Sequence, residues 1–420
     1  MGIKPIKILW QSDSPLLPTG YSYVVRNILT RLSKDPDFEV VAVAANAFQG
    51  IPLKKATLED GTELNFPILP QGREPYNRDM IIPYILKHKP DVYCFLQDTF
   101  MYADPFINGL PWLATLDFPC KTIFYYPSDG DPFPAGCEPI LKKMTVPVAM
   151  SKFAQEQVKK EFNIDAEYIP HGVNTEDFKP LNIPKEELRT KTTCVMIDKN
   201  NALISFKGIL KNKFVAFSVF RNQGRKMPDL QLKAWKEFSK DKEDVIMLMH
   251  TDPMDRTAVF DMRLFINQHK LNNKVVFTGM QFHTPFTTEQ LNEFYNCADI
   301  YFQSTSGEGW GLTTTESMSC EIPILLTNYT TTDEIVTKHN AGLAVPYIST
   351  LTGTYNVERA LMNIDKAVES LQIMYDDWKC GGKKLKEWGK NGRKACQEEY
   401  EWDKVVDTYW KPLLKKMVEE

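Results

Sequence analysis

The chain lacks the features that mark membrane, metal or disulfide proteins. No apolar run in its 420 residues is long enough to cross a bilayer. None of its eight cysteines has CxxC spacing, which disfavours zinc and thiol-redox sites and favours buried thiols in a reducing compartment. The opening MGIKPIKILW predicts a strand rather than a signal peptide, and Ile6 does not fit a myristoylation pattern. We therefore expect a cytoplasmic protein without integral membrane contact.

The sequence also lacks a large excess of positive or negative charge. The formal net charge is −4, with 43% hydrophobic and 25% charged residues, so no global basic excess points to nucleic acid or a membrane surface. The sequence shows no internal repeat of the kind found in solenoids. A length of 420 residues suits two or three domains.

What the sequence does contain is two successive series of short apolar runs that alternate with helical patterns. This alternation predicts α/β architecture with parallel sheets covered on both faces. The first series has expected strands at 6–10, 40–45, 92–97, 122–126 and 147–150 and helices at 21–33, 78–87 and 152–162. The second has strands at 214–220, 245–250, 275–278, 300–303 and 324–327 and helices at 230–239, 259–269, 288–297 and 313–320.

Two further stretches complete this organisation. Residues 174–213 are rich in Pro, Lys and Thr and predict a connection between two domains, with a surface excursion around 191–212 that has no assigned chemistry. Residues 357–420 predict a mainly helical tail. The whole pattern indicates two doubly wound, Rossmann-like domains.

A glycine-rich turn is the strongest chemical signal. Three glycines lie between a strand ending near Gln303 and a helix beginning near Thr313. Glycines let the backbone approach a ligand, and a helix N-terminus favours phosphate, so the turn is a candidate diphosphate site. Glu308 in the loop and Glu316 in the helix could accept hydrogen bonds from a sugar and a ribose. The residues alone equally allow a solvated Glu308 and an exposed first-turn Glu316.

The stretch GEGWGLTTTESMSCEIPIL resembles the Glu-x7-Glu signature of retaining GT-B glycosyltransferases, the group 1 or glycogen-synthase-like C-terminal domain. Trp310 replaces the usual Phe, and Glu321 stands where Gly is common. The resemblance implies that Glu308 contacts the donor sugar and Glu316 the nucleotide ribose. The donor-binding residues it implies are Gly20, Arg221, Lys226, Glu308, Gly309, Trp310, Gly311, Leu312, Thr313 and Glu316.

Four further segments resemble the same family in order. Residues 12–29 match its first glycine loop, with Gly20 remaining. Residues 150–180 match the domain junction, where His171 replaces Asn and is more often structural than catalytic. Residues 217–230 carry Arg221, Arg225 and Lys226; Arg221 and Lys226 match the family's Arg and Lys, which neutralise the departing diphosphate.

The fourth segment, residues 398–416, matches the family's C-terminal helix, which crosses back onto the N-terminal domain. Trp402, Val405, Val406, Tyr409 and Leu413 share its helical stripe. The resemblance thus implies a GT-B fold whose two Rossmann-like domains face a cleft. We expect an acceptor-side domain of residues 1–175 plus 403–420 and a nucleotide-sugar domain of residues 176–402.

The reacting groups of the N-terminal domain are less defined. Asp129 is the expected polar group beside the sugar, with Asp131 as the alternative, and both follow the strand at 122–126. Asp98 and Tyr21 are expected on the acceptor side. All three aspartates also suit ordinary turns beside Gly and Pro. The expected catalytic set is Asp129, Arg221, Lys226 and Glu308, with no metal.

The function implied is retaining transfer of a sugar from a nucleoside-diphosphate sugar, most simply a UDP-sugar, without another cofactor. The acceptor stays open among a glycan, a lipid, a protein and a modified nucleic-acid base, and the oligomeric state stays open as well. Two alternatives share the architecture: a nucleotide-sugar 2-epimerase and a non-catalytic sugar-nucleotide binding protein.

Overall fold

The computed structural model describes residues 4–46, 49–104, 106–255, 258, 260–279 and 286–419. By internal contacts the chain forms two compact units. The first runs to Gly172 and includes Thr354–Val357 and the chain from Tyr400 onward. The second comprises Val173–Gly353 and Glu358–Glu399. The sequence had placed the corresponding boundaries at 175 and 403.

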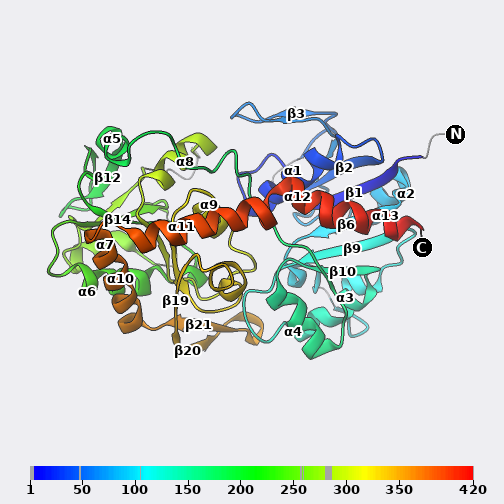
Figure 1. The fold of residues 1–420 in the computed structure, drawn as a ribbon. Coiled ribbons are helices and arrows are strands. Elements are labelled where there is room, and N and C mark those ends of the chain that lie inside the picture. The colour runs from blue at the N-terminus through cyan, green and yellow to red at the C-terminus, as the bar shows by residue number, and fades with distance from the viewer. Residues whose placement is uncertain are drawn as a thin grey trace. The chain divides into compact units, whose positions relative to one another are not determined.

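The first unit is built on a seven-stranded sheet in the order β11-β10-β9-β6-β1-β2-β5 (Figure 1), in which every strand pairing is parallel. Its inner strands are buried almost throughout because helices cover both faces. The strands are β1 Ile6–Asp13, β2 Phe38–Ala45, β5 Ile68–Leu69, β6 Val92–Leu96, β9 Lys121–Tyr126, β10 Val146–Ala149 and β11 Glu167–Tyr168.

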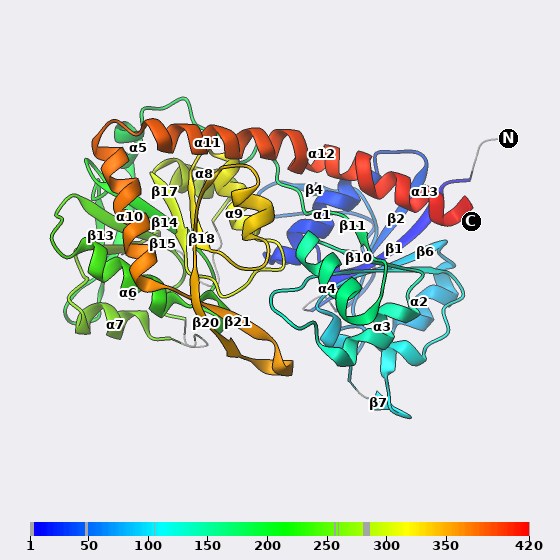
Figure 2. The same ribbon diagram turned by 60° about the horizontal axis from the view of Figure 1, so that its bottom comes forward.

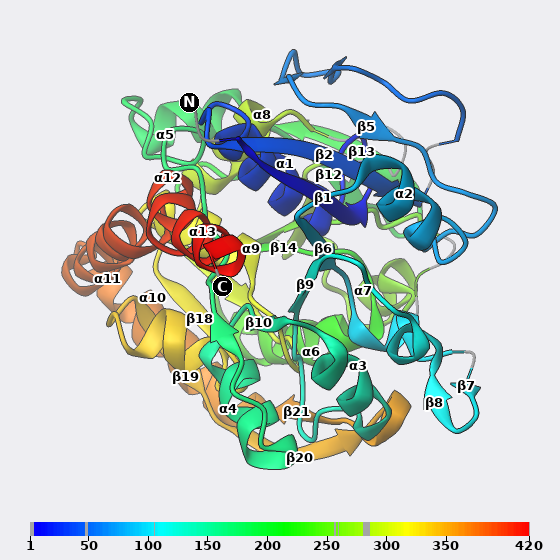
Figure 3. The same ribbon diagram turned by 90° about the vertical axis from the view of Figure 1, so that its right-hand side faces the viewer.

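The helices of this unit are α1 Gly20–Leu32, α2 Ile81–His88, α3 Glu138–Lys143 and α4 Lys152–Phe162. Thr19 caps α1 by accepting a hydrogen bond from the Ser22 N–H. Two small hairpins stand off the sheet: β3 Ala56–Thr57 with β4 Glu63–Leu64, and β7 Phe106–Ile107 with β8 Leu110–Pro111 (Figure 3). The helix expected at 78–87 begins at Ile81.

The end of the chain belongs to the first unit, where α12 Trp402–Val405 and α13 Lys411–Glu419 lie along α1 and β1 (Figure 1). A π-helical turn at Val406–Trp410 joins them and brings Trp410 inward. The Trp410 ring centroid is 4.8 Å from that of Trp10 and 5.0 Å from that of Tyr125. The expected stripe therefore packs as predicted, except that Trp410 joins it and Tyr409 stays partly exposed.

The second unit has an eight-stranded sheet in the order β13-β12-β16-β15-β14-β17-β18-β19. The excursion expected around 191–212 is a hairpin that adds β12 and β13 to one edge in antiparallel fashion, and the other pairings are parallel. The strands are β12 Thr193–Ile197, β13 Leu203–Lys207, β14 Phe214–Val219, β15 Val245–His250, β16 Val275–Phe277, β17 Ile300–Gln303, β18 Ile324–Thr327 and β19 Gly342–Val345.

The described part of residues 357–420 is mainly helical, as expected, but a strand comes before its first helix. Strand β21 Glu358–Met362 pairs there with β20 Tyr347–Thr352 in an antiparallel hairpin (Figure 2). The helix expected at 259–269 begins at Met262, and residue 259 lies outside the described residues. The helices are α5 Lys185–Lys191, α6 Pro228–Ser239, α7 Met262–Gln268, α8 Thr288–Asn296, α9 Leu312–Ser319, α10 Ile364–Lys379 and α11 Lys383–Ala395.

Helix α11 supports the element that carries the glycine-rich turn. It lies against α9, and the contact is so close that a Cβ atom at Gly389 would lie 2.1 Å from the Glu321 carbonyl oxygen. A Cβ atom at Gly392 would lie 3.1 Å from the Met318 side chain. Only glycine allows the approach at residue 389, and a side chain at residue 392 would require Met318 to shift, so the two glycines set the close packing of α11 on α9.

Candidate active site

The glycine-rich turn links β17 to α9 at the carboxyl end of the second unit's sheet, as the sequence pattern predicts. Gly311 precedes the helix with φ of 106°, a left-handed conformation that L side chains rarely adopt. Thr314 and Thr315 donate their backbone N–H groups to the Gly311 carbonyl. The first N–H groups of α9 have no intrahelical acceptor, which is the arrangement that favours an anion.

A second loop is bound to this turn by short hydrogen bonds. After β14 ends, a single 3₁₀ turn covers Gly224–Lys226. The Arg225 carbonyl accepts from the Ser306 N–H at 2.7 Å and from its hydroxyl at 2.9 Å, and Ser304 Oγ donates to the Met227 carbonyl at 2.6 Å. The basic loop and the glutamate loop thus form one rigid structure.

Glu308 is buried between two cations of that basic loop. Arg225 Nη1 lies 2.6 Å from its Oε2, and Lys226 Nζ lies 2.5 Å from its Oε1. The Thr305 hydroxyl donates to Oε1 at 2.8 Å, and the Glu308 N–H donates to Thr330 Oγ1 at 3.0 Å. Two positive groups face one carboxylate, so this cluster has a surplus positive charge suited to an anionic ligand.

The charge state of Glu308 follows from these contacts. Burial alone would raise the pKa of its carboxyl, but the charges and hydrogen bonds of Arg225 and Lys226 outweigh burial and lower the pKa to about 2. The carboxylate is therefore ionised at every pH where the protein would work.

Arg225 was identified in the sequence only as a neighbour, whereas Arg221 was matched to the family's arginine. In the structure Arg225 contacts Glu308, while Arg221 is exposed. Lys226 also contacts Glu308. No signal in the sequence separates the two arginines, because the direction of each side chain depends on the 3₁₀ turn between them.

Glu316 lies in quite different surroundings. It is buried on α9, and its Oε2 accepts a hydrogen bond from the Tyr295 hydroxyl at 2.7 Å. No cation pairs with it among the residues the structure describes. Burial raises the pKa of its carboxyl to about 7, against the opposing hydrogen bond from Tyr295. The Glu316 side chain predicted in the helix is therefore partly protonated near pH 7.

The remaining donor-side residues surround this turn. Trp310 is 3% exposed, and its carbonyl accepts from Thr331 Oγ1 at 2.8 Å. Thr313 Oγ1 is 2.7 Å from the Tyr301 hydroxyl. Gly309 and Leu312 are partly exposed. All four lie on the turn or the first turn of α9, within five residues of Glu308 in the chain.

In the first unit, Tyr21 and Asp98 come together from separate elements. The Tyr21 hydroxyl, on the first turn of α1 next to Gly20, donates to Asp98 Oδ1 at 2.9 Å. Asp13, at the end of β1, was missed by the sequence analysis. It accepts hydrogen bonds from Thr19 Oγ1 at 2.8 Å, and from the side-chain amides of Asn46 at 2.8 Å and Gln97 at 3.1 Å. Asp13 therefore braces both the loop before α1 and the loop that carries Asp98.

The two aspartates after β9 differ in their contacts. Asp131 Oδ1 accepts a hydrogen bond from the Gln157 amide at 3.1 Å, and the same amide donates to the Gly130 carbonyl at 2.8 Å. Asp129 is partly exposed on the same turn. Gln157 on α4 therefore holds the loop that carries both aspartates through Gly130 and Asp131.

His171 contacts a buried tyrosine of the first unit's sheet. It is buried, and its Nδ1 is 2.6 Å from the Tyr125 hydroxyl. Burial lowers the pKa of the imidazole to about 3, so the ring is neutral near pH 7.

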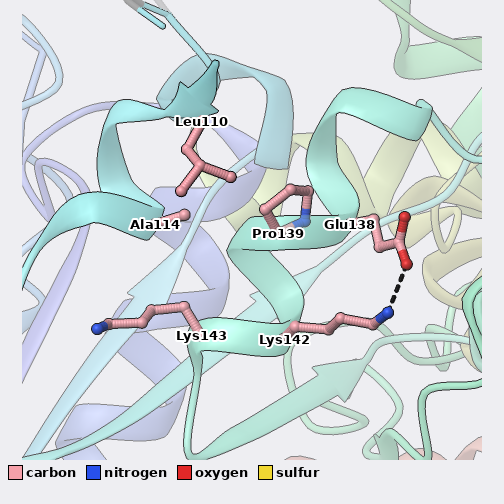
Figure 4. Close-up of a pocket in the computed structure, with 6 residues that line it drawn as sticks. All are labelled: Leu110, Ala114, Glu138, Pro139, Lys142 and Lys143. Carbon is pink, nitrogen blue, oxygen red and sulfur yellow. Dashed lines mark hydrogen bonds and ion pairs between the residues drawn. The ribbon is translucent and has the colours of Figure 1, made fainter. Parts of the chain in front are cut away.

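A surface pocket on the first unit lies apart from these groups. Figure 4 shows its lining by Leu110, Ala114, Pro139 and Lys143, with Lys142 paired to Glu138 at 2.6 Å. It contains no predicted site residue. Within the described ranges, no three His, Cys, Asp or Glu side chains gather as a metal site would require. No described helix is both long and apolar enough to span a membrane.

Residues 200–395 match the model of the family described as glycosyl transferases group 1. Alpha-maltose-1-phosphate synthase of Mycolicibacterium smegmatis is 24% identical over 215 residues, which are 50% of this chain. The match spans 47% of that relative, so the chain aligns with about half of its length.

Solved structures resemble almost the whole chain. Sucrose-phosphate synthase from Thermosynechococcus elongatus has a TM-score of 0.72 at 14% identity, covering 99% of this chain and 100% of that one. Anabaena HepE in complex with UDP has a TM-score of 0.69 at 12% identity, covering 98% and 100%. Starch synthase IV from Arabidopsis thaliana, bound to ADP and acarbose, has a TM-score of 0.63 at 11% identity, covering all of both. The chain therefore has the GT-B fold.

Proposed function

We infer from the membership of residues 200–395 in the group 1 glycosyltransferases that this chain transfers a sugar from a nucleoside-diphosphate sugar to an acceptor hydroxyl with retention. The observation that carries this proposal is the buried cluster of Arg225, Lys226 and Glu308 beside the N-terminus of α9. Its surplus positive charge suits a diphosphate.

In the proposed reaction, the bond between the anomeric carbon and the β-phosphate oxygen breaks as the acceptor oxygen attacks the same face. The acceptor proton passes to the leaving phosphate oxygen, and the nucleoside diphosphate departs. Arg225 and Lys226 would stabilise the charge that grows on the diphosphate, which lowers the barrier because that charge is larger in the transition state. Glu308 would bind hydroxyls of the sugar, and Glu316 the ribose.

The structures of relatives with UDP or ADP support a nucleotide at this site, and we propose a UDP-sugar as the donor. Arg221 stays a candidate for the diphosphate. Asp129 stays the proposed polar group beside the reacting sugar, and Asp98 with Tyr21 the proposed acceptor-side pair. The acceptor itself remains one of the classes that carry a free hydroxyl. We place the protein in the cytoplasm and propose that the reaction needs no metal.

The test is nucleotide release from a panel of UDP-, ADP- and GDP-sugars, followed by mass spectrometry with and without cell extract as acceptor. We expect release of one nucleotide and a sugar-bearing product whose anomeric configuration matches the donor. Tight donor binding without release would make the chain a sugar-nucleotide binding protein, and conversion of the donor to its 2-epimer would make it an epimerase.

A further inference from the structure

Tyr295 is a buried tyrosine that contacts the proposed ribose-binding carboxylate and has no role so far. It lies on α8, completely buried between the rings of Phe178 and Phe217, whose centroids are 5.7 Å and 5.2 Å from its own. Its hydroxyl donates to Glu316 Oε2 at 2.7 Å. Rings on two sides fix the tyrosine, so its hydroxyl can hold the carboxylate in one orientation.

The other oxygen of Glu316 is left available. Among the described residues, the structure gives Oε1 no hydrogen bond. A carboxylate with one oxygen held by the protein and the other open can accept a ligand hydroxyl while keeping its orientation.

We propose that Tyr295 is a positioning residue for Glu316, holding one carboxylate oxygen so that the other accepts a ribose hydroxyl of the nucleotide donor. This inference rests on the proposed function, since it takes Glu316 as the ribose-binding group. Tyr295 itself touches no substrate in this arrangement.

Proton linkage is the consequence that separates this role from simple packing. The carboxyl of Glu316 has a pKa of about 7, so near neutral pH it is partly protonated. Ribose hydroxyls donate to the ionised form, so nucleotide binding at pH 7 should release a fraction of a proton. Without Tyr295 the pKa of Glu316 would rise further, and binding at neutral pH would weaken.

The other titratable groups near Glu316 do not compete for this proton. Burial raises the pKa values of the Tyr295 and Tyr301 hydroxyls and of the Cys320 thiol, so all three stay protonated near neutral pH. The Cys396 thiol and the Arg393 guanidinium lie close enough to Cys320 to act on its pKa. Glu316 is therefore the group whose charge changes between pH 6 and 8.

The test is calorimetric binding of UDP, ADP and GDP at pH 6.5, 7.5 and 8.5, in two buffers with different heats of ionisation. For Tyr295→Phe we expect about tenfold weaker binding at pH 7.5 and a smaller loss at pH 8.5, with more protons released than in the wild type. Glu316→Gln should bind without proton release. Tyr375→Phe is the matched control, because Tyr375 donates to Asp244 at 2.8 Å outside this site, and it should bind as the wild type does.

The double variant Tyr295→Phe/Glu316→Gln completes the test. If Tyr295 acts through Glu316, its removal adds nothing once the carboxylate is gone, whereas a merely structural role makes the two losses add. Equal affinity and proton release in Tyr295→Phe and wild type, or additive losses, would overturn this inference. Failure of the wild type to bind any of UDP, ADP and GDP would instead overturn the proposed function.

Discussion

Glu308 and Glu316 lie eight residues apart, are both buried, and are held in opposite ways. Glu308 is ionised because two cations surround it, and its pKa is about 2. Glu316 has a tyrosine hydroxyl in place of cations, and its pKa is about 7. The difference teaches that the surroundings, rather than the residue type, distinguish the two proposed roles: a fixed charge beside the donor sugar, and a titratable acceptor for the ribose.

The largest expected effect comes from removing the fixed charge. Glu308→Gln should lower kcat by about 100- to 1000-fold, because a preorganised charge beside the sugar is lost and two cations lose their shared partner. Steady-state kinetics with the identified donor measures this. Glu293→Gln, which alters an exposed carboxylate of α8, is the control and should retain activity. A Glu308→Gln enzyme with normal kcat would remove Glu308 from the reacting centre.

The next effect concerns which arginine serves the diphosphate. Arg225→Ala and Lys226→Ala should each lower kcat/KM by about 10- to 100-fold, since a charge-assisted contact near the leaving group is lost. Arg221→Ala should cost less than about fivefold, because its side chain is exposed. The opposite ranking of the two arginines would restore the assignment made from the sequence.

Acid unfolding should reveal the cation-held glutamate. The folded pKa of Glu308 lies below its usual 4.5, so its stabilisation is present above pH 4.5 and is lost as pH falls toward 2. By pH 3 the loss should be about 2 kcal/mol, measured by denaturant unfolding as the difference between wild type and Glu308→Gln. A difference that does not change between pH 7 and pH 3 would contradict the charge state given to Glu308.

The contribution of Glu316 to stability should depend on pH in the opposite direction. Its folded pKa lies above its usual 4.5, so its contribution is fully present below pH 4.5 and is lost as pH rises through about 7. Relative to wild type, Glu316→Gln should therefore gain about 2.5 kcal/mol in free energy of unfolding between pH 5 and pH 8.5. Parallel stability curves for the two proteins would show that the carboxyl of Glu316 titrates normally.

Much of the fold could be read from the sequence. The strands at 245–250, 300–303 and 324–327 have the predicted bounds, because buried parallel strands leave continuous apolar runs. The edge strands β12 and β13 were missed although each contains a short apolar run, because the Pro, Lys and Thr residues around them favoured a connection between domains. Trp410 was missed because a π-helical turn shifts the buried stripe away from ordinary helical spacing.

The candidate site, like the fold, has some features that the sequence predicts and others that only the structure shows. The sequence by itself determined the glycine-rich turn, the two glutamates and the nearby cations, because these depend on local spacing between a strand and a helix. Only the tertiary structure decided that Arg225 meets Glu308, that Tyr295 meets Glu316, and that Asp13 holds the first unit's loops. These pairings join elements distant in the chain, and the charge of a buried carboxyl depends on what those distant elements place beside it.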